Sequence, residues 1–243
     1  MNLFYNSRSV VLGLIITVVG FTFAQAQDLA KNTGNSTNGV QSQKAPEPQT
    51  EYSTTPNEIG FYGGVSTFHK DLRGPSAGGN LGVLAFRFSH RMIDGKSIKL
   101  RYVADFIPVA IMNYPRDREF QTSTGTTEII HDRKTVYGFG IAPGGLQLNF
   151  RNRKKYQPFI AGNVGIMYLT EIVPDFRTPL HPRATGAKIN YTAEFGAGLE
   201  IGLKENRNFF VGYKYHHLSN LYTGNINIGY NSNMIYAGMM FGY

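Results

Sequence analysis

Alternating apolar and polar side chains characterise the chain downstream of residue 58. Within residues 81–89, Leu84, Phe86 and Phe88 share one parity, whereas Arg87 belongs to the other. A repeat of two residues is typical of β-strands whose two faces meet different environments. The pattern therefore predicts strands that separate an apolar surface from a polar one.

Eight segments rich in Tyr, Phe, Val, Ile and Gly follow one another from Ile59 to the C-terminus, as expected for strands. Their expected bounds are 59–66, 81–89, 98–110, 134–150, 156–169, 190–201, 208–217 and 233–243. The connections alternate between short turns, such as 151–155, and long loops, such as 111–133 and 170–189. Short turns at one rim and long loops at the other are typical of bacterial outer-membrane barrels. Eight strands make the smallest such barrel, with an interior filled by side chains rather than a channel.

The polar face of these segments carries charges. In the segment that begins at residue 98, charged side chains oppose a continuous apolar stripe. A soluble β-sandwich buries its apolar face and wets its polar face, so alternation alone is compatible with both architectures. In a barrel the charged face lies inside, where the following residues are expected to pair: Arg87, Arg101, Asp105, Glu194 and Lys214.

The N-terminal part of the chain differs from the rest. Residues 1–26 combine Arg8, an apolar run of 14 residues at 10–23 and the cleavage pattern Ala-Gln-Ala, which together predict a secretory signal peptide. The apolar run is shorter than the roughly 20 residues that a membrane-spanning helix needs. Residues 27–57 are polar with few large apolar side chains, so we expect a flexible tether. The barrel domain is expected over residues 58–243.

Composition narrows the classes of function. The 243 residues carry 24 Lys+Arg and 16 Asp+Glu, a net charge of +8, and contain no Cys. The lack of Cys excludes disulfides, cysteine-ligated zinc and cysteine nucleophiles. Charged residues make up only 16% of the chain and the basic ones are not clustered, so no nucleic-acid partner is expected. No later segment is long enough for a membrane helix, so membrane integration would require a closed barrel.

The C-terminal segment ends on an aromatic residue. Ile235, Met239, Phe241 and Tyr243 share one face of the expected strand. A terminal aromatic residue on an apolar face resembles the assembly signal of outer-membrane proteins. This feature agrees with the predicted export signal and with the alternating connection lengths. The sequence therefore predicts an all-β, eight-stranded antiparallel barrel in the outer membrane of a Gram-negative bacterium.

The segment at 208–217 presents an ionisable side chain to the lipid. Lys214 belongs inside the barrel, so the opposite parity, with Tyr213, Tyr215 and His217, faces outward. An imidazole on a lipid-facing wall is a candidate for a functional site. Ser219 has the same parity as His217, so the imidazole can accept the proton of the hydroxyl. Taken alone, the tetrapeptide favours the polar rim of a strand over a catalytic site.

A longer motif follows His217. The stretch HLSNLYTGNINIGYNS, residues 217–232, resembles the signature of the lipid A 3-O-deacylase family, also called outer-membrane acyloxyacyl hydrolases. The matching positions beyond the His-x-Ser-Asn tetrapeptide are Gly224, Asn227, Gly229, Asn231 and Ser232. This family consists of eight-stranded outer-membrane serine hydrolases that remove an ester-linked acyl chain from lipid A. The resemblance implies Ser219 as nucleophile, His217 as general base, lipid A of lipopolysaccharide as partner, and no metal or cofactor.

Two positions depart from the family pattern. Asn231 stands where the family has the Glu that orients the histidine; an Asn can orient a neutral imidazole but cannot stabilise the imidazolium, so slower turnover is expected. Asn220, implied in the oxyanion hole, is kept, but Tyr222 replaces the Gly whose backbone N–H is the second donor. That N–H survives the substitution, and it is lost only if the required φ is one that Tyr resists. An inert barrel is the alternative outcome of these changes.

Other polar groups have weaker chemical implications. His216 and His217 point to opposite faces, so this pair predicts no metal site. Tyr213 and Tyr215 are expected to flank the acyl chain on the wall. The following basic loop residues can meet lipid A phosphates or are solvated charges: Lys70, Arg73, Arg116, Arg118, Arg133, Arg177, Arg183 and Lys188. The alternative function is a non-catalytic small barrel with a structural or adhesive role. The sequence predicts neither the cleaved acyl position nor an oligomeric state.

Overall fold

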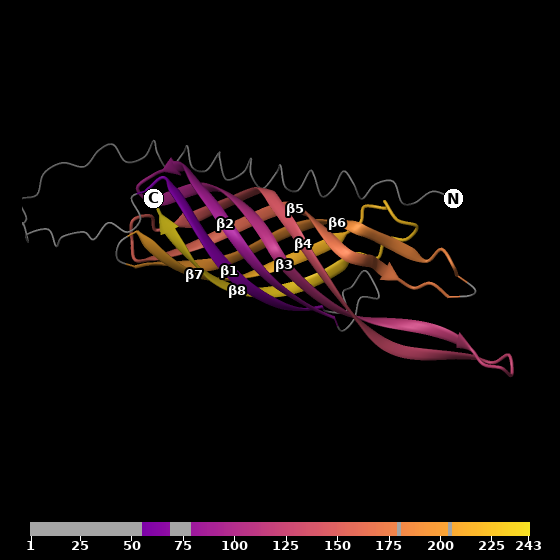
Figure 1. Ribbon diagram of the computed structural model, residues 1–243. Helices are drawn as coiled ribbons and strands as arrows, with labels where there is room; N and C mark the ends of the chain where they lie inside the picture. The colour runs from indigo at the N-terminus through magenta and orange to yellow at the C-terminus, as the bar shows by residue number, and fades with distance from the viewer. Residues whose placement is uncertain (1–54, 69–78, 179–180, 204–205) are drawn as a thin grey trace, which may run out of the picture. The chain divides into compact units, whose positions relative to one another are not determined.

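The fold is a closed antiparallel barrel of eight strands, as the alternation predicts (Figure 1). The computed structural model describes residues 55–68, 79–178, 181–203 and 206–243; the expected signal peptide and residues 27–54 of the expected tether lie outside the described residues. The strands are β1 (Asn57–Phe68), β2 (Asn80–Asp94), β3 (Ile98–Gln121), β4 (Thr127–Phe150), β5 (Tyr156–Asp175), β6 (Thr185–Gly202), β7 (Arg207–Ser219) and β8 (Tyr230–Gly242). Each strand pairs with its neighbours in the chain, and β8 closes on β1. In the described part of the chain, no helix is long and apolar enough to cross a membrane.

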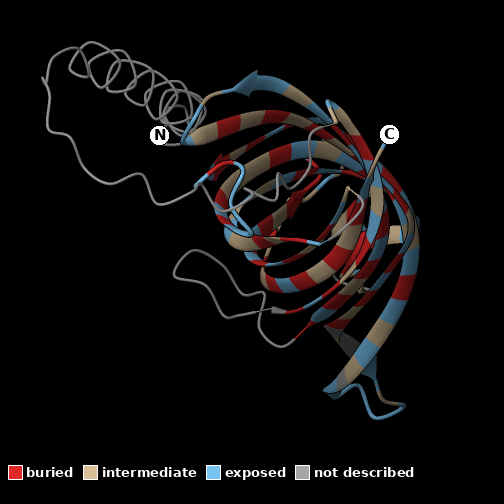
Figure 2. Ribbon diagram, turned by 90° about the vertical axis from the view of Figure 1, so that its left-hand side faces the viewer, coloured by how far each residue is buried: buried red, intermediate tan, exposed pale blue. Residues whose placement is uncertain are grey.

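The two faces of each strand alternate between a buried interior and an exposed outer wall, visible as alternating colours along the ribbons in Figure 2. The outer wall is apolar, with large side chains exposed on every strand, among them Phe61, Phe86, Phe139, Phe195 and Ile235. A water-soluble barrel would place such side chains inside. The exposed apolar wall is therefore the face that meets lipid.

The barrel has two distinct ends. The turn end carries the β2–β3 and β4–β5 turns, which Asn152 joins by donating from its backbone N to the Ser97 carbonyl at 3.1 Å. The loop end carries the β3–β4 hairpin and the β7–β8 loop. Short turns face the periplasm in outer-membrane barrels, so the loop end faces the cell exterior.

Charged side chains fill the interior nearer the turn end. Arg87 Nε lies 2.7 Å from Asp105 Oδ1, and Lys214 Nζ lies 2.7 Å from Glu194 Oε2. Arg101 pairs with Glu58 and lies 3.6 Å from Glu200. At most 8% of any of these side chains is exposed. These distances confirm the expected pairing of Arg87, Arg101, Asp105, Glu194 and Lys214. Burying an unpaired charge is strongly unfavourable, so buried charges occur in pairs.

Truncating Asp105 is expected to destabilise the barrel. Its carboxylate accepts from Arg87, from the Tyr62 hydroxyl at 3.0 Å and from Asn163 Nδ2 at 3.1 Å. Asp105→Ala leaves a buried guanidinium without its carboxylate, which costs about 3–5 kcal/mol. Denaturant unfolding in detergent micelles measures this loss. Asp132→Ala, at a partly exposed 3.9 Å pair with Arg116, serves as the control and should cost about 1 kcal/mol or less. Equal losses for the two variants would contradict the prediction.

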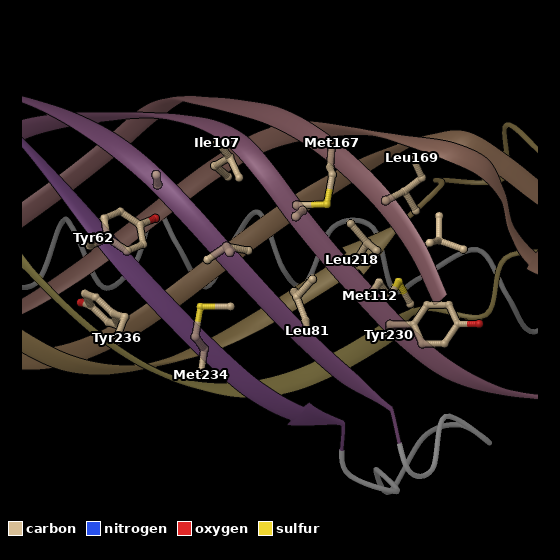
Figure 3. Packing of buried hydrophobic residues seen from close by; sticks show 14 of the residues in the cluster. Tyr62, Leu81, Ile107, Met112, Met167, Leu169, Leu218, Tyr230, Met234 and Tyr236 are labelled. Atoms are coloured by element: carbon tan, nitrogen blue, oxygen red, sulfur yellow. The ribbon is translucent and has the colours of Figure 1, made fainter. Parts of the chain in front are cut away.

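Apolar side chains fill the interior toward the loop end. Leu81, Met112, Leu169, Leu218 and Met234 are fully buried there (Figure 3). These side chains come from β2, β3, β5, β7 and β8 and belong to one cluster of buried residues. The interior is therefore packed in its described part, in agreement with the expectation of a filled barrel rather than a channel.

The prediction of a long loop at 111–133 is wrong. β3 and β4 continue past the rest of the barrel as a hairpin, paired from Ile111↔Tyr137 to Gln121↔Thr127 and projecting at the lower right of Figure 1. The loop expected at 170–189 is also shorter, because β5 extends to Asp175 and β6 begins at Thr185. Beyond the membrane both faces of a strand meet water, so the apolar alternation that identifies a strand is lost.

Candidate active site on the outer wall

Strand β7 separates the charged interior from the candidate site. Lys214 and His216 are buried inside, where both approach Glu194, at 2.7 and 3.6 Å. Tyr213 and Tyr215 are 51% and 41% exposed on the outer wall, and His217 is partly exposed on the same face. The imidazole therefore lies on the lipid-facing side near the end of the strand, the face that parity predicts. Among the described residues, no cluster of His, Cys, Asp and Glu could hold a metal ion.

His217 is oriented by Asn231. The two residues are a cross-strand pair of β7 and β8, and His217 Nδ1 lies 2.5 Å from Asn231 Oδ1. An amide oxygen only accepts, so Nδ1–H is the donor and the lone pair of the neutral ring is on Nε2. Gly229 makes room for the ring, because a Cβ at this position would lie 2.6 Å from His217 Cε1. The arrangement gives an imidazole whose Nε2 is able to accept a proton.

Ser219, the last residue of β7, is 6% exposed and contacts Asn227. The amide of Asn227 faces Oγ, with Nδ2 at 2.9 Å and Oδ1 at 3.1 Å, and the Leu221 backbone N–H donates to Oγ at 3.2 Å. Within the described residues these bonds, and none to His217, hold the hydroxyl. No role was predicted for Asn227 from the sequence, although its position in the signature motif could have indicated one.

The residues after Ser219 form a tight turn. Leu221 and Tyr222 both have positive φ, 50° and 62°, and the Thr223 backbone N–H donates to the Asn220 carbonyl at 2.9 Å. This φ is unfavourable for a residue with a Cβ, and Tyr222 adopts it at the position where the resemblance implies a Gly. The Tyr222 N–H survives and donates to Asn220 Oδ1 at 2.9 Å, while Asn220 Nδ2 donates to the Ile226 carbonyl at 2.8 Å. Both expected oxyanion donors are therefore engaged within the loop.

The β7–β8 loop packs against the first residues of β6. The Ile226 backbone N–H donates to the Thr185 carbonyl at 3.0 Å, and Asn225 Nδ2 donates to Thr185 Oγ1 at 3.0 Å. Gly224 approaches Gly186 so closely that a Cβ on Gly224 would lie 2.3 Å from the Gly186 backbone. These contacts fix the loop that carries Asn227, and they explain why a Gly is needed at position 224.

The basic loop residues fall into several groups. Lys70 and Arg73 lie outside the described residues, and the side chain of Arg118 is not described. Arg177 Nε lies 2.9 Å from Asp175 Oδ1, and Arg133 Nε donates to Asn113 Oδ1 at 2.6 Å. Both Arg177 and Arg133 thus have partners within the protein.

The fold and the site together define a class: a membrane-spanning β-barrel with a serine and a held histidine at its lipid-facing wall. In the comparison with protein families, the model of the lipid A 3-O-deacylase (PagL) family matches residues 112–240. The match covers more than half of the chain, and the chain belongs to this family. Lipid A lies in the outer membrane of Gram-negative bacteria, so the family and the apolar wall place the protein in that membrane.

Solved barrels are also similar to the chain. The crystal structure of the outer-membrane enzyme PagL has a TM-score of 0.45 and 13% identity, covering 76% of this chain and 99% of that one. Neisserial surface protein A has a TM-score of 0.43 and 12% identity, covering 78% and 98%. No individually curated protein matches the sequence.

Proposed function

We propose that the protein is a serine esterase that removes an ester-linked acyl chain from lipid A in the outer leaflet. Ser219 is the nucleophile, His217 the general base, and Asn231 the residue that orients His217. The observation that carries this proposal is the 2.5 Å bond from His217 Nδ1 to Asn231, which leaves Nε2 as the proton acceptor two residues from a serine. Membership of the deacylase family supports the same chemistry.

The proposed reaction follows from the positions of these groups. The Ser219 hydroxyl turns from Asn227 toward His217, Nε2 takes its proton, and Oγ attacks the ester carbonyl carbon. The tetrahedral intermediate collapses as the sugar oxygen leaves with the proton from Nε2, and the acyl chain remains on Oγ. Water, deprotonated by His217, then releases the fatty acid and restores Ser219. The route needs only groups of this protein and water.

Backbone and amide donors near Ser219 would stabilise the oxyanion. We assign this role to Asn220 and the Tyr222 N–H, which must exchange their bonds within the loop for bonds to the oxyanion. Asn227 Nδ2, at 2.9 Å from Oγ, is the donor nearest the reacting atoms. Donors of this kind contribute about 3–4 kcal/mol each to transition-state stabilisation.

The apolar wall beside the site suits an acyl chain. Tyr213 and Tyr215 lie on the turn-end side of His217 on β7, opposite Ala197 and Phe195 of β6. Phe195 is exposed, as are both tyrosines. A lipid that diffuses laterally would meet this surface without leaving the membrane, so Tyr213 and Tyr215 are proposed to flank the bound chain.

Mass spectrometry of lipid A tests the proposal. Cells that express the full chain should contain lipid A lighter by one acyl chain, and cells that express Ser219→Ala at equal membrane levels should not. Identical spectra from the two strains, with folded barrel in both membranes and a lipid A that carries the ester, would overturn the proposal and favour the non-catalytic barrel.

Gly229→Ala is expected to lower deacylation roughly 10-fold, because the added Cβ displaces the His217 ring by a fraction of an ångström from its working position. Gly82→Ala is the matched control, since a Cβ on Gly82 meets no atom within 4 Å. Initial rates of fatty-acid release from purified lipid A measure both variants. Full activity of Gly229→Ala would show that the ring position is not critical.

A further inference from the structure

Basic side chains gather at the turn end of the barrel, the end near the C label in Figure 1. Two segments there, 91–98 around the β2–β3 turn and 151–156 around the β4–β5 turn, carry six basic residues and one acidic residue, Asp94. The basic residues are Arg91, Lys96, Arg151, Arg153, Lys154 and Lys155. All are exposed except Arg91, which is partly exposed. We call the two segments the basic turns.

Most of this positive charge is not neutralised within the protein. Arg91 and Arg153 share the single carboxylate of Asp94, each at 3.3 Å. The basic residues that form no ion pair within the described part of the chain include Lys96, Arg151 and Lys154. Several basic residues of the loop end, in contrast, have carboxylate partners, such as Arg177 with Asp175. The counter-charge for the basic turns therefore comes from outside the protein.

Asn152 fixes the two basic turns to each other. Its side chain is 5% exposed, and Nδ2 donates to Asp94 Oδ1 at 2.5 Å and to the Gly95 carbonyl at 2.7 Å. The Arg153 backbone N–H donates to Asn152 Oδ1 at 2.9 Å. The basic turns thus present one preformed surface, and a ligand that binds there does not have to order the backbone first.

Two arginines of the β4–β5 turn have an unfavourable backbone conformation. Arg151 and Arg153 have positive φ, 55° and 63°, which Gly and Asn adopt more readily than a residue with a long side chain. A turn that only joined two strands would be more stable with Gly or Asn at these positions. Such strain is common at functional sites, and a guanidinium matches the oxygens of a phosphate group.

The basic turns lie where the apolar outer wall ends. Phe150 and Tyr156, on either side of the β4–β5 turn, are 38% and 47% exposed on that wall. Aromatic side chains at the ends of the apolar band mark the lipid–water interface of outer-membrane barrels. Lys155 Nζ lies 5.6 Å from the ring centroid of Tyr156. The basic groups are therefore at the level of the lipid headgroups, on the periplasmic side to which short turns belong.

We propose that the basic turns bind the phosphate group of an anionic phospholipid in the periplasmic leaflet, with its acyl chains against the neighbouring apolar wall. Such a lipid supplies both of the chemistries that this end requires, a negative charge and a hydrocarbon chain. Attraction to an anionic lipid increases with each Lys or Arg near the membrane surface. A zwitterionic phospholipid has no net charge and is bound more weakly. The site is at the other end of the barrel from Ser219, so the proposal does not depend on the esterase activity.

Native mass spectrometry of the protein purified from membranes into neutral detergent micelles tests this proposal. With equal amounts of dioleoylphosphatidylglycerol and dioleoylphosphatidylethanolamine added, the wild type should bind the anionic lipid roughly 10-fold more tightly. Arg151→Asn/Lys154→Gln/Lys155→Gln should lower the affinity for the anionic lipid roughly 10-fold or more, and Asn tolerates the positive φ at position 151. Arg133→Gln/Arg183→Gln/Lys188→Gln removes the same charge at the loop end and should keep the wild-type preference.

The outcomes decide between an anionic lipid and other negatively charged ligands. Equal binding of the two lipids, binding of neither, or a preference that the triple variant of the basic turns keeps would overturn the proposal. Inorganic phosphate at the concentration of the lipid should not displace it, because phosphate makes no contact with the apolar wall. Displacement by phosphate would indicate a site for the free anion instead. Binding to purified peptidoglycan that this variant loses, without a preference between the lipids, would assign the basic turns to the cell wall.

Discussion

Replacing His217 with Ala is expected to lower deacylation about 10³- to 10⁴-fold. In the proposed reaction the imidazole held by Asn231 takes the Ser219 proton, and a positioned general base contributes an acceleration of this size. The barrel should fold normally, because His217 lies on the outer wall rather than in the interior. Release of fatty acid from purified lipid A in detergent, followed over hours, measures the residual rate.

His216→Gln is the control for His217→Ala. The two residues are adjacent, but His216 is buried inside and lies 3.6 Å from Glu194. Its replacement can change barrel stability without touching the outer wall, so the activity per folded barrel should stay near that of the wild type. An equal loss in both variants, at equal amounts of folded barrel, would mean that the effect of His217→Ala comes from the strand rather than from proton transfer.

Much of the barrel is predictable because the membrane imposes a two-residue repeat. Inside the lipid layer every strand has one apolar and one interior face, so the parity of Lys214 sufficed to place His217 on the wall. The same parity identified the interior charges, including Arg87 and Asp105, that the structure pairs at 2.7 Å. The β3–β4 hairpin was missed because water surrounds both of its faces, and residues 111–133 therefore lack the repeat.

The candidate site is less predictable than the fold. The motif identified Ser219 and His217 as neighbours, but the contact of Asn227 with Ser219 spans eight residues of an irregular loop. Neither parity nor spacing describes such a loop, since its shape depends on the close approach of Gly224 to Gly186. The positive φ of Tyr222 could not be predicted from the sequence either, because a tyrosine gives no indication of a left-handed conformation.

Asn231→Glu is expected to raise deacylation about 10²-fold. Asn231 already holds His217 in the tautomer with its lone pair on Nε2, so the substitution adds only the negative charge that stabilises the imidazolium formed during attack. Loss of both charge and tautomer control in a serine protease costs about 10⁴-fold, and charge alone should account for a smaller part. The hydrogen bond from His217 Nδ1 would offset part of the desolvation cost of a carboxylate at this position.

Asn231→Gln and Asn231→Leu complete the comparison. Gln has the length of Glu without its charge, so a rate equal to or below that of the wild type would assign the gain in Asn231→Glu to the carboxylate. Leu removes the acceptor for Nδ1–H, lets the imidazole turn or change tautomer, and should lower the rate about 10-fold or more. Steady-state rates on purified lipid A distinguish these effects. If Asn231→Leu were as active as the wild type and Asn231→Glu brought no gain, Asn231 would not be the residue that orients the base, and the 2.5 Å contact would only join β7 to β8.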